Sequence, residues 1–295
     1  PIGHINCALA IVKNLPSDSS LRQTFYEEAW ARLPDVTDQK QRFYLMGRLI
    51  DGGQADLAPA KLAGALPTML SESEPFELVQ LIETLATWDG PVRKPFMTRL
   101  AEHDRGRDAL LRWIAALHNV GVLGPKQPDP PHARLAQVRA DLAPAHYDDL
   151  MQTAGSWIAA QVQAGHSALQ MVDAVAPELA ATAIADLLQV YDQQSNTYER
   201  AVVLCILAPY SNDADRLSAF GAALKVHIRD GGFGLTEYAV QNLQDGQLEE
   251  ALATVSAAFA GAGELDQNAL RACILAWLAL SDRDMARSND LRVRV

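Results

Sequence analysis

Apolar residues recur along the chain every three or four positions, in segments that Gly, Pro and Asp separate. In the segment 17–33, for example, Leu21, Phe25 and Ala29 lie one helical turn apart, and Pro34 ends the pattern. No segment shows the strict alternation that is typical of a β-strand. The pattern predicts helices over 17–33, 38–50, 57–70, 76–88, 95–102, 108–120, 134–142, 145–164, 168–176, 178–193, 197–207, 213–229, 235–243, 248–259 and 267–280.

Composition favours the same fold class. Alanine and leucine, both strong helix formers, dominate the 295 residues, whereas aromatic residues make up only 6%. The hydrophobic fraction of 49% is enough for a sizeable core. We therefore expect an all-α protein, built either as antiparallel helix pairs stacked in a superhelix or as two helical subdomains.

One internal boundary stands out. Residues 121–131 contain two glycines and four prolines, which are incompatible with both a helix and a central strand. The sequence thus predicts an N-terminal helical subdomain at 1–120, a linker or long loop at 121–133, a C-terminal helical subdomain at 134–280 and a polar tail at 281–295.

Helices are repeatedly followed by an Asp-Gly turn, as at Asp51-Gly52 and Asp89-Gly90. A glycine just past a helix supplies the left-handed residue that caps it. The segment 245–252, Asp-Gly-Gln-Leu-Glu-Glu-Ala-Leu, resembles the turn and the start of the second helix in a tetratricopeptide unit. The other positions of that family do not recur at its spacing of about 34 residues. The looser HEAT or armadillo pattern of paired helices accommodates the sequence more easily.

The formal net charge is -11, and the acidic excess lies late in the chain: 12 bases face 21 acids after residue 124, against 13 and 15 before it. A nucleic-acid partner is therefore not expected. We interpret the one local basic concentration as a solvated helix face; it consists of Arg93, Lys94, Arg99, Arg105, Arg107 and Arg112. The acidic C-terminal half favours a partner with a basic segment.

The cysteines, the apolar stretches and the first residues of the chain bear on disulfides, metal sites and cellular location. Cys7, Cys205 and Cys273 are widely spaced in apolar surroundings, which predicts buried free thiols rather than disulfides or a zinc site. No apolar stretch is long enough to span a membrane. The first residues lack a secretory signal, so the cytoplasm is the default location, although a chain that begins at Pro1 is also compatible with one region of a larger secreted bacterial effector.

The seven histidines show none of the common metal-binding spacings, so neither a metal nor a cofactor is expected. The weak candidates for a catalytic role are His103, His146 and His166. His103 lies between Glu102 and Asp104 at a predicted helix junction, where a solvated turn is the simpler interpretation. His146 and His166 lie at opposite ends of the helix predicted at 145–164, about 30 Å apart, and so cannot share a metal.

These observations favour a non-enzymatic helical-repeat scaffold or adaptor that binds another protein, because stacked helix pairs offer an extended surface. Two alternatives stay open. One is an all-α enzyme or small-ligand-binding protein with a pocket between helices, and the other is the helical region of a bacterial effector. An apolar face on a terminal helix pair would also allow homo-oligomerisation.

Overall fold

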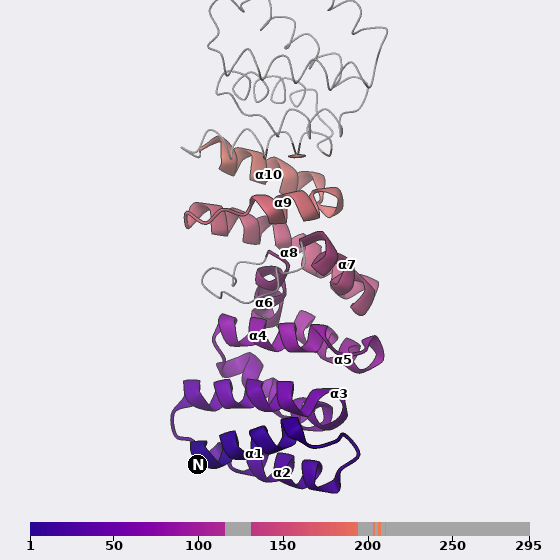
Figure 1. Cartoon of the computed structure of the whole chain (residues 1–295). Coiled ribbons are helices and arrows are strands. Elements are labelled where there is room, and N and C mark those ends of the chain that lie inside the picture. The colour runs from indigo at the N-terminus through magenta and orange to yellow at the C-terminus, as the bar shows by residue number, and fades with distance from the viewer. Residues whose placement is uncertain (116–130, 194–202, 204–205, 208–209, 211–295) are drawn as a thin grey trace, which may run out of the picture. The chain divides into compact units, whose positions relative to one another are not determined.

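The computed structural model describes residues 1–115, 131–193, 203, 206, 207 and 210 (Figure 1). All regular structure within these residues is helical, which confirms the all-α prediction. No helix in the described part of the chain is long and apolar enough to cross a membrane. The helices are α1 (Ile2–Asn14), α2 (Ser20–Ala31), η1 (Leu33–Asp35), α3 (Gln39–Glu72), α4 (Pro75–Ala86), α5 (Gly90–Ala101), α6 (Asp104–Ile114), α7 (Pro131–Asp141), α8 (Pro144–Gln163), α9 (Leu169–Val175), η3 (Ala176–Glu178) and α10 (Ala181–Asp192).

The chain divides into two compact units, residues 1–150 and residues 151–295. Helix α7 packs against α5 and α6 and therefore belongs to the first unit. Most of the predicted linker at 121–133 lies outside the described residues, so the domain division drawn from the sequence stays a prediction. The tetratricopeptide-like segment 245–252 and all helices predicted after residue 193 also lie outside them.

Most helix positions agree with the periodicity to within a few residues, but the first helix is missing from the sequence prediction. Helix α1 buries Ile5, Leu9 and Val12 along one stripe, and its N-cap residue, Pro1, offers no side-chain hydrogen bond. Cys7 lies off that stripe and is exposed, so the expectation of a buried thiol is wrong for this residue. Cys205 and Cys273 lie outside the described residues.

Helix α3 is in fact two helices folded back on each other. A straight helix of its length would span about 50 Å, yet the side-chain amide of Gln39 donates to the carboxylate of Glu72 over 3.1 Å. The fold-back occurs at Gln54, whose backbone is not helical. The two helices predicted at 38–50 and 57–70 are thereby confirmed.

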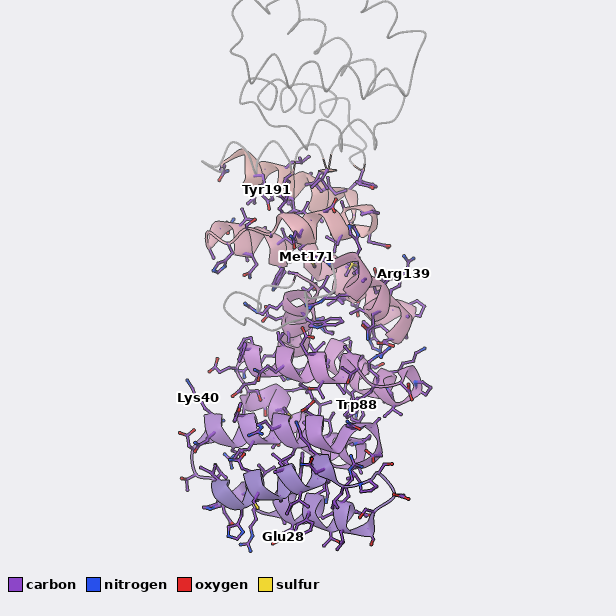
Figure 2. All side chains as sticks on the ribbon, viewed as in Figure 1. Glu28, Lys40, Trp88, Arg139, Met171 and Tyr191 are labelled. Carbon is purple, nitrogen blue, oxygen red and sulfur yellow. The ribbon has the colours of Figure 1, made fainter. Side chains whose placement is uncertain are left out.

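The principal contacts within the first unit join helices that are close in chain order: α1 with α2 and α3, α2 with α3, α3 with α4, α4 with α6, and α5 with α6 and α7. Side chains fill the spaces between them (Figure 2). Leu66 of α3, Ile82 of α4 and Ile114 of α6 are completely buried. Trp88, labelled in Figure 2, packs edge-on against Phe96 with ring centroids 5.9 Å apart.

Helices of the second unit also pack closely. A Cβ atom on Gly155 of α8 would lie 2.7 Å from the Cβ of Ala183 on α10. Only a glycine therefore allows this approach of the two helices. In the same unit, Ile158, Val172 and Ile184 are completely buried.

Arginines close the C-terminal ends of helices in the first unit. The last carbonyls of a helix have no partner within it, and they form the negative end of its dipole. In five helices an arginine from a later helix donates to a carbonyl at this end: Arg22 to Val12 of α1, Arg105 to Ser71 of α3, Arg93 to Ala86 of α4, Arg107 to Ala101 of α5 and Arg134 to Trp113 of α6.

The most buried of these arrangements joins α5 to α7. Both nitrogens of one edge of the Arg93 guanidinium donate to Asp141, over 2.6 and 3.0 Å, and the two side chains are only 13% and 1% exposed. The interpretation of the basic concentration as a solvated helix face is therefore wrong for Arg93. Such a bidentate pair orients its partners as well as neutralising them.

We predict that Asp141→Asn lowers the free energy of unfolding by about 3–5 kcal/mol, because it leaves the buried guanidinium without a counter-charge. Urea unfolding followed by circular dichroism measures this change. Asp35→Asn is the matched control: Arg32 and Asp35 are 3.7 Å apart and both 53% exposed, so its effect should stay below about 1 kcal/mol. Equal effects of the two substitutions would contradict a structural role for the buried pair.

Candidate functional site

The three histidines singled out from the sequence have different surroundings. His103 is the N-cap of α6, where its Nδ1 accepts a hydrogen bond from the amide of Arg105 over 3.3 Å. His146, in the first turn of α8, has its Nε2 3.6 Å from a carboxylate oxygen of Glu102. His166 is exposed and follows the left-handed Gly165, beyond the end of α8. The structure thus brings Glu102 to His146, a pairing that the sequence did not suggest, and the catalytic role of the three histidines stays a prediction.

Within the described ranges, no group of three or more His, Cys, Asp and Glu residues is arranged to hold a metal ion. A small hollow between α1 and α2, about 110 Å³ in volume, holds the exposed Cys7 beside His4, but no hydrogen bond joins the two side chains.

A larger cleft lies where α1 ends, α2 begins and α3 folds back. Its volume is about 430 Å³, and its lining combines charged, polar and apolar residues: Val12, Lys13, Leu15, Ser17, Arg22, Asp51, Gly52 and Gln54. Sequence reasoning missed this kink cleft because its residues come from three elements and match no known motif. The only signal was the turn expected at Asp51-Gly52-Gly53.

Arg22 organises the inner side of the kink cleft. Its side chain is only 6% exposed and forms an ion pair with Asp56. The same guanidinium donates to the carbonyls of Val12 and Gly52 over 3.3 and 3.4 Å. One side chain therefore ties the end of α1 to both halves of α3.

A second ion pair lies nearer the solvent. Lys13 Nζ is 3.0 Å from a carboxylate oxygen of Asp51, and the two side chains are 47% and 58% exposed. Lys13, Arg22 and Asp51 line the cleft, whereas Asp56 pairs with Arg22 from outside the lining. Each positive charge of the cleft is therefore balanced by a carboxylate.

Gln54 adopts a backbone conformation that only glycine reaches easily, with φ 53° and ψ -158°. Among the described residues it is the one non-glycine with a positive φ. Such a conformation costs about 1–3 kcal/mol, and strained residues of this kind cluster at ligand clamps and switch regions.

The neighbouring glycines serve close packing instead of a left-handed cap. A Cβ on Gly53 would come within 2.6 Å of the Tyr26 ring and hydroxyl, and one on Gly52 within 2.9 Å of Leu9. Neither has a positive φ, and Gly90 is the first residue of α5. The prediction that glycines at Asp51-Gly52 and Asp89-Gly90 cap helices is therefore wrong.

Behind the glycines lies the hydroxyl of Tyr26, which is buried and has no hydrogen-bond partner. Burial raises the pKa of the Tyr26 phenol well above its ordinary value, Asp56 raises it further, and Arg22 opposes this rise. An unbonded buried hydroxyl is unfavourable for the folded state.

Comparison of the chain with family models, with curated proteins and with solved structures gives no match. The function is therefore inferred from the geometry.

We predict that Gln54→Gly raises the free energy of unfolding by about 1 kcal/mol, because relief of the strained backbone outweighs the added freedom of the unfolded chain. Chemical denaturation measures the difference. The control is Gln80→Gly at an exposed position inside α4, which should lower stability by about 1 kcal/mol. A loss of stability in both variants would show that Gln54 is not strained.

For Tyr26→Phe we expect unchanged or higher stability at neutral pH, since the hydroxyl that is lost has no partner. Above a pH of about 10, Tyr26 ionises in the unfolded chain but stays protonated in the folded protein. The unfolded state then binds fewer protons, so the wild-type loses stability as the pH rises, and Tyr26→Phe lacks this part of the loss. Denaturation at several pH values measures it, with Tyr44→Phe at an exposed ring as the control; parallel curves for wild-type and Tyr26→Phe would contradict the expectation.

Proposed function

We propose that this protein is a non-enzymatic helical scaffold that binds a segment of another protein. The observation that carries the proposal is the packing order in the first unit, where the principal contacts join helices close in the chain. Helix pairs of this kind bury their apolar faces only by stacking on their neighbours, and the stack presents long faces made of successive helices. A HEAT-like or tetratricopeptide-like superhelix is the architecture we propose for the chain.

The buried charges support a structural over a catalytic use. Arg22 and Arg93 each bond a helix end and a carboxylate at the same time. A guanidinium held in this way has its charge compensated and its position fixed. These contacts therefore maintain the fold.

Three successive helices carry a large exposed apolar side chain each. Leu21 of α2 is 58% exposed, Tyr44 of α3 54% and Phe76 of α4 50%. The guanidinium of Arg48 lies 5.9 Å from the centre of the Tyr44 ring and restrains it. Rigid aromatic and apolar side chains of this type are the usual anchors of protein interfaces.

The acidic C-terminal half is the second part of the proposal. It would attract a basic segment of the partner and increase the association rate at low salt. Of the 21 acids in this half, 14 lie outside the described residues, so this part depends on the sequence. A cytoplasmic location is likewise proposed from the sequence alone.

The kink cleft favours a second candidate, a small-ligand-binding protein, because its volume of about 430 Å³ is in the range of ligand sites. Each of its cationic side chains pairs with a carboxylate, Lys13 with Asp51 and Arg22 with Asp56. A site for acid-base chemistry would instead direct such groups toward a substrate. This pairing supports binding over reaction.

We predict that the immobilised chain captures a specific protein from lysate of its source organism or host, and that high salt weakens the capture. The triple variant Leu21→Ser, Tyr44→Ser and Phe76→Ser should capture at least about tenfold less of the partner, because each anchor contributes on the order of 1 kcal/mol or more to the binding free energy. Mass spectrometry quantifies the partner, and circular dichroism verifies the fold.

The matched control changes exposed polar residues on the same three helices, Gln23→Ala, Gln41→Ala and Gln80→Ala, and should retain the partner. If the wild-type captures no protein and elutes with a small molecule only, the second candidate replaces the scaffold. If the triple variant captures the partner as well as the control does, the three anchors are not the binding surface.

A further inference from the structure

We infer that the kink cleft binds an uncharged stretch of peptide main chain. The inference deepens the proposed function, on which it rests for the statement that the ligand belongs to a partner protein. It follows from the helix ends around the cleft, from its charge balance and from its size.

Two helix C-terminal ends and two side chains with N–H donors meet at the cleft. Helix α1 ends at Asn14 and the first half of α3 ends before Gln54, so carbonyls without a helical partner point out of both ends. Arg22 of α2 and Gln54 also line the cleft, and both side chains carry N–H donors. A ligand in the cleft is therefore offered donors and acceptors together.

Peptide main chain presents the complementary groups, one N–H donor and one carbonyl acceptor per residue. The cleft already contains one example of this recognition, because Arg22 donates to the main-chain carbonyls of Val12 and Gly52. A guanidinium has five N–H donors, and Arg22 uses one on each of its three nitrogens. Two donors thus remain for a further carbonyl.

Charge balance selects against ionic ligands. An anion attracted by Lys13 or Arg22 would be repelled by Asp51 and Asp56, which pair with them. A cation attracted by the two aspartates would be repelled by Lys13 and Arg22. Displacing Asp56 from the buried Arg22 would in addition break a largely desolvated ion pair. An amide has no net charge and avoids both penalties.

Size and strain agree with this assignment. The cleft, at about 430 Å³, lies within the range of about 300–1,000 Å³ that is typical of ligand sites, whereas the hollow between α1 and α2 measures about 110 Å³. The strained residue Gln54 is exposed and lines the cleft, and its side chain carries a primary amide, a second group that can bond to main chain.

The test is a titration of the full chain with N-acetyl-glycyl-glycine amide, followed by amide chemical shifts in NMR. We expect saturable shifts at Ser17, Arg22 and Gln54 at millimolar concentrations of the capped dipeptide. Inorganic phosphate and arginine amide, the anionic and cationic probes, should bind at least tenfold more weakly. Absence of saturable shifts with the dipeptide, or tighter binding of either charged probe, would overturn the inference.

Variants at the exposed connection between α1 and α2 locate the binding without touching the core. Ser17 lines the cleft and its neighbour Asp18 does not. Ser17→Phe should fill the cleft and weaken dipeptide binding at least tenfold, whereas Asp18→Phe should leave it unchanged. Equal binding by both variants would place the dipeptide elsewhere and remove the inference.

The inference and the proposed function fail in different ways. If the dipeptide does not bind while the chain still captures its partner, the scaffold stands and the cleft is not its binding site. If the dipeptide binds in the cleft while no partner is captured, the cleft is a site for a free amide ligand and the scaffold is wrong.

Discussion

Closure of helix ends by arginine is the interaction on which the first unit depends. Short helices packed side by side bring many C-terminal carbonyls into places where water cannot satisfy all of them. Arg93 bonds the end of α4, and Arg134 the end of α6, each from a helix that follows in the chain. The same contact therefore satisfies a carbonyl and positions the later helix. The helices of this unit then pack mainly on helices that are close to them in the chain.

Where the arginine is buried, closure requires a counter-charge, because a buried guanidinium is unfavourable when it stands alone. Asp141 meets this need for Arg93, Asp56 for Arg22 and Glu83 for Arg134. The acidic partners lie 34 to 51 positions from their arginines along the chain. The charges of these three arginines are thus internal, although nothing in the sequence distinguishes them from arginines on a solvated surface.

Local signals in the sequence explain what could be predicted. Helical periodicity survives because each helix buries one stripe, and both halves of α3 were found in this way. Helix α1 was missed because Pro1 offers no capping side chain. The role of Gly53 could not be derived from the sequence, because a glycine is needed there only to make room for the Tyr26 ring, which belongs to another helix. The kink cleft was likewise out of reach, because ion pairs such as Lys13 with Asp51 join positions that no motif relates.

The kink cleft follows from the same constraint as the rest of the unit. At the fold-back of α3 two helix C-terminal ends, those of α1 and of the first half of α3, lie beside a single arginine, Arg22. One guanidinium bonds one carbonyl from each, and a cleft of about 430 Å³ stays open next to it. The backbone strain at Gln54 arises where the chain must reverse within this crowded junction. A binding site for main-chain groups is therefore expected where closure of helix ends is incomplete, because the groups left over are main-chain groups themselves.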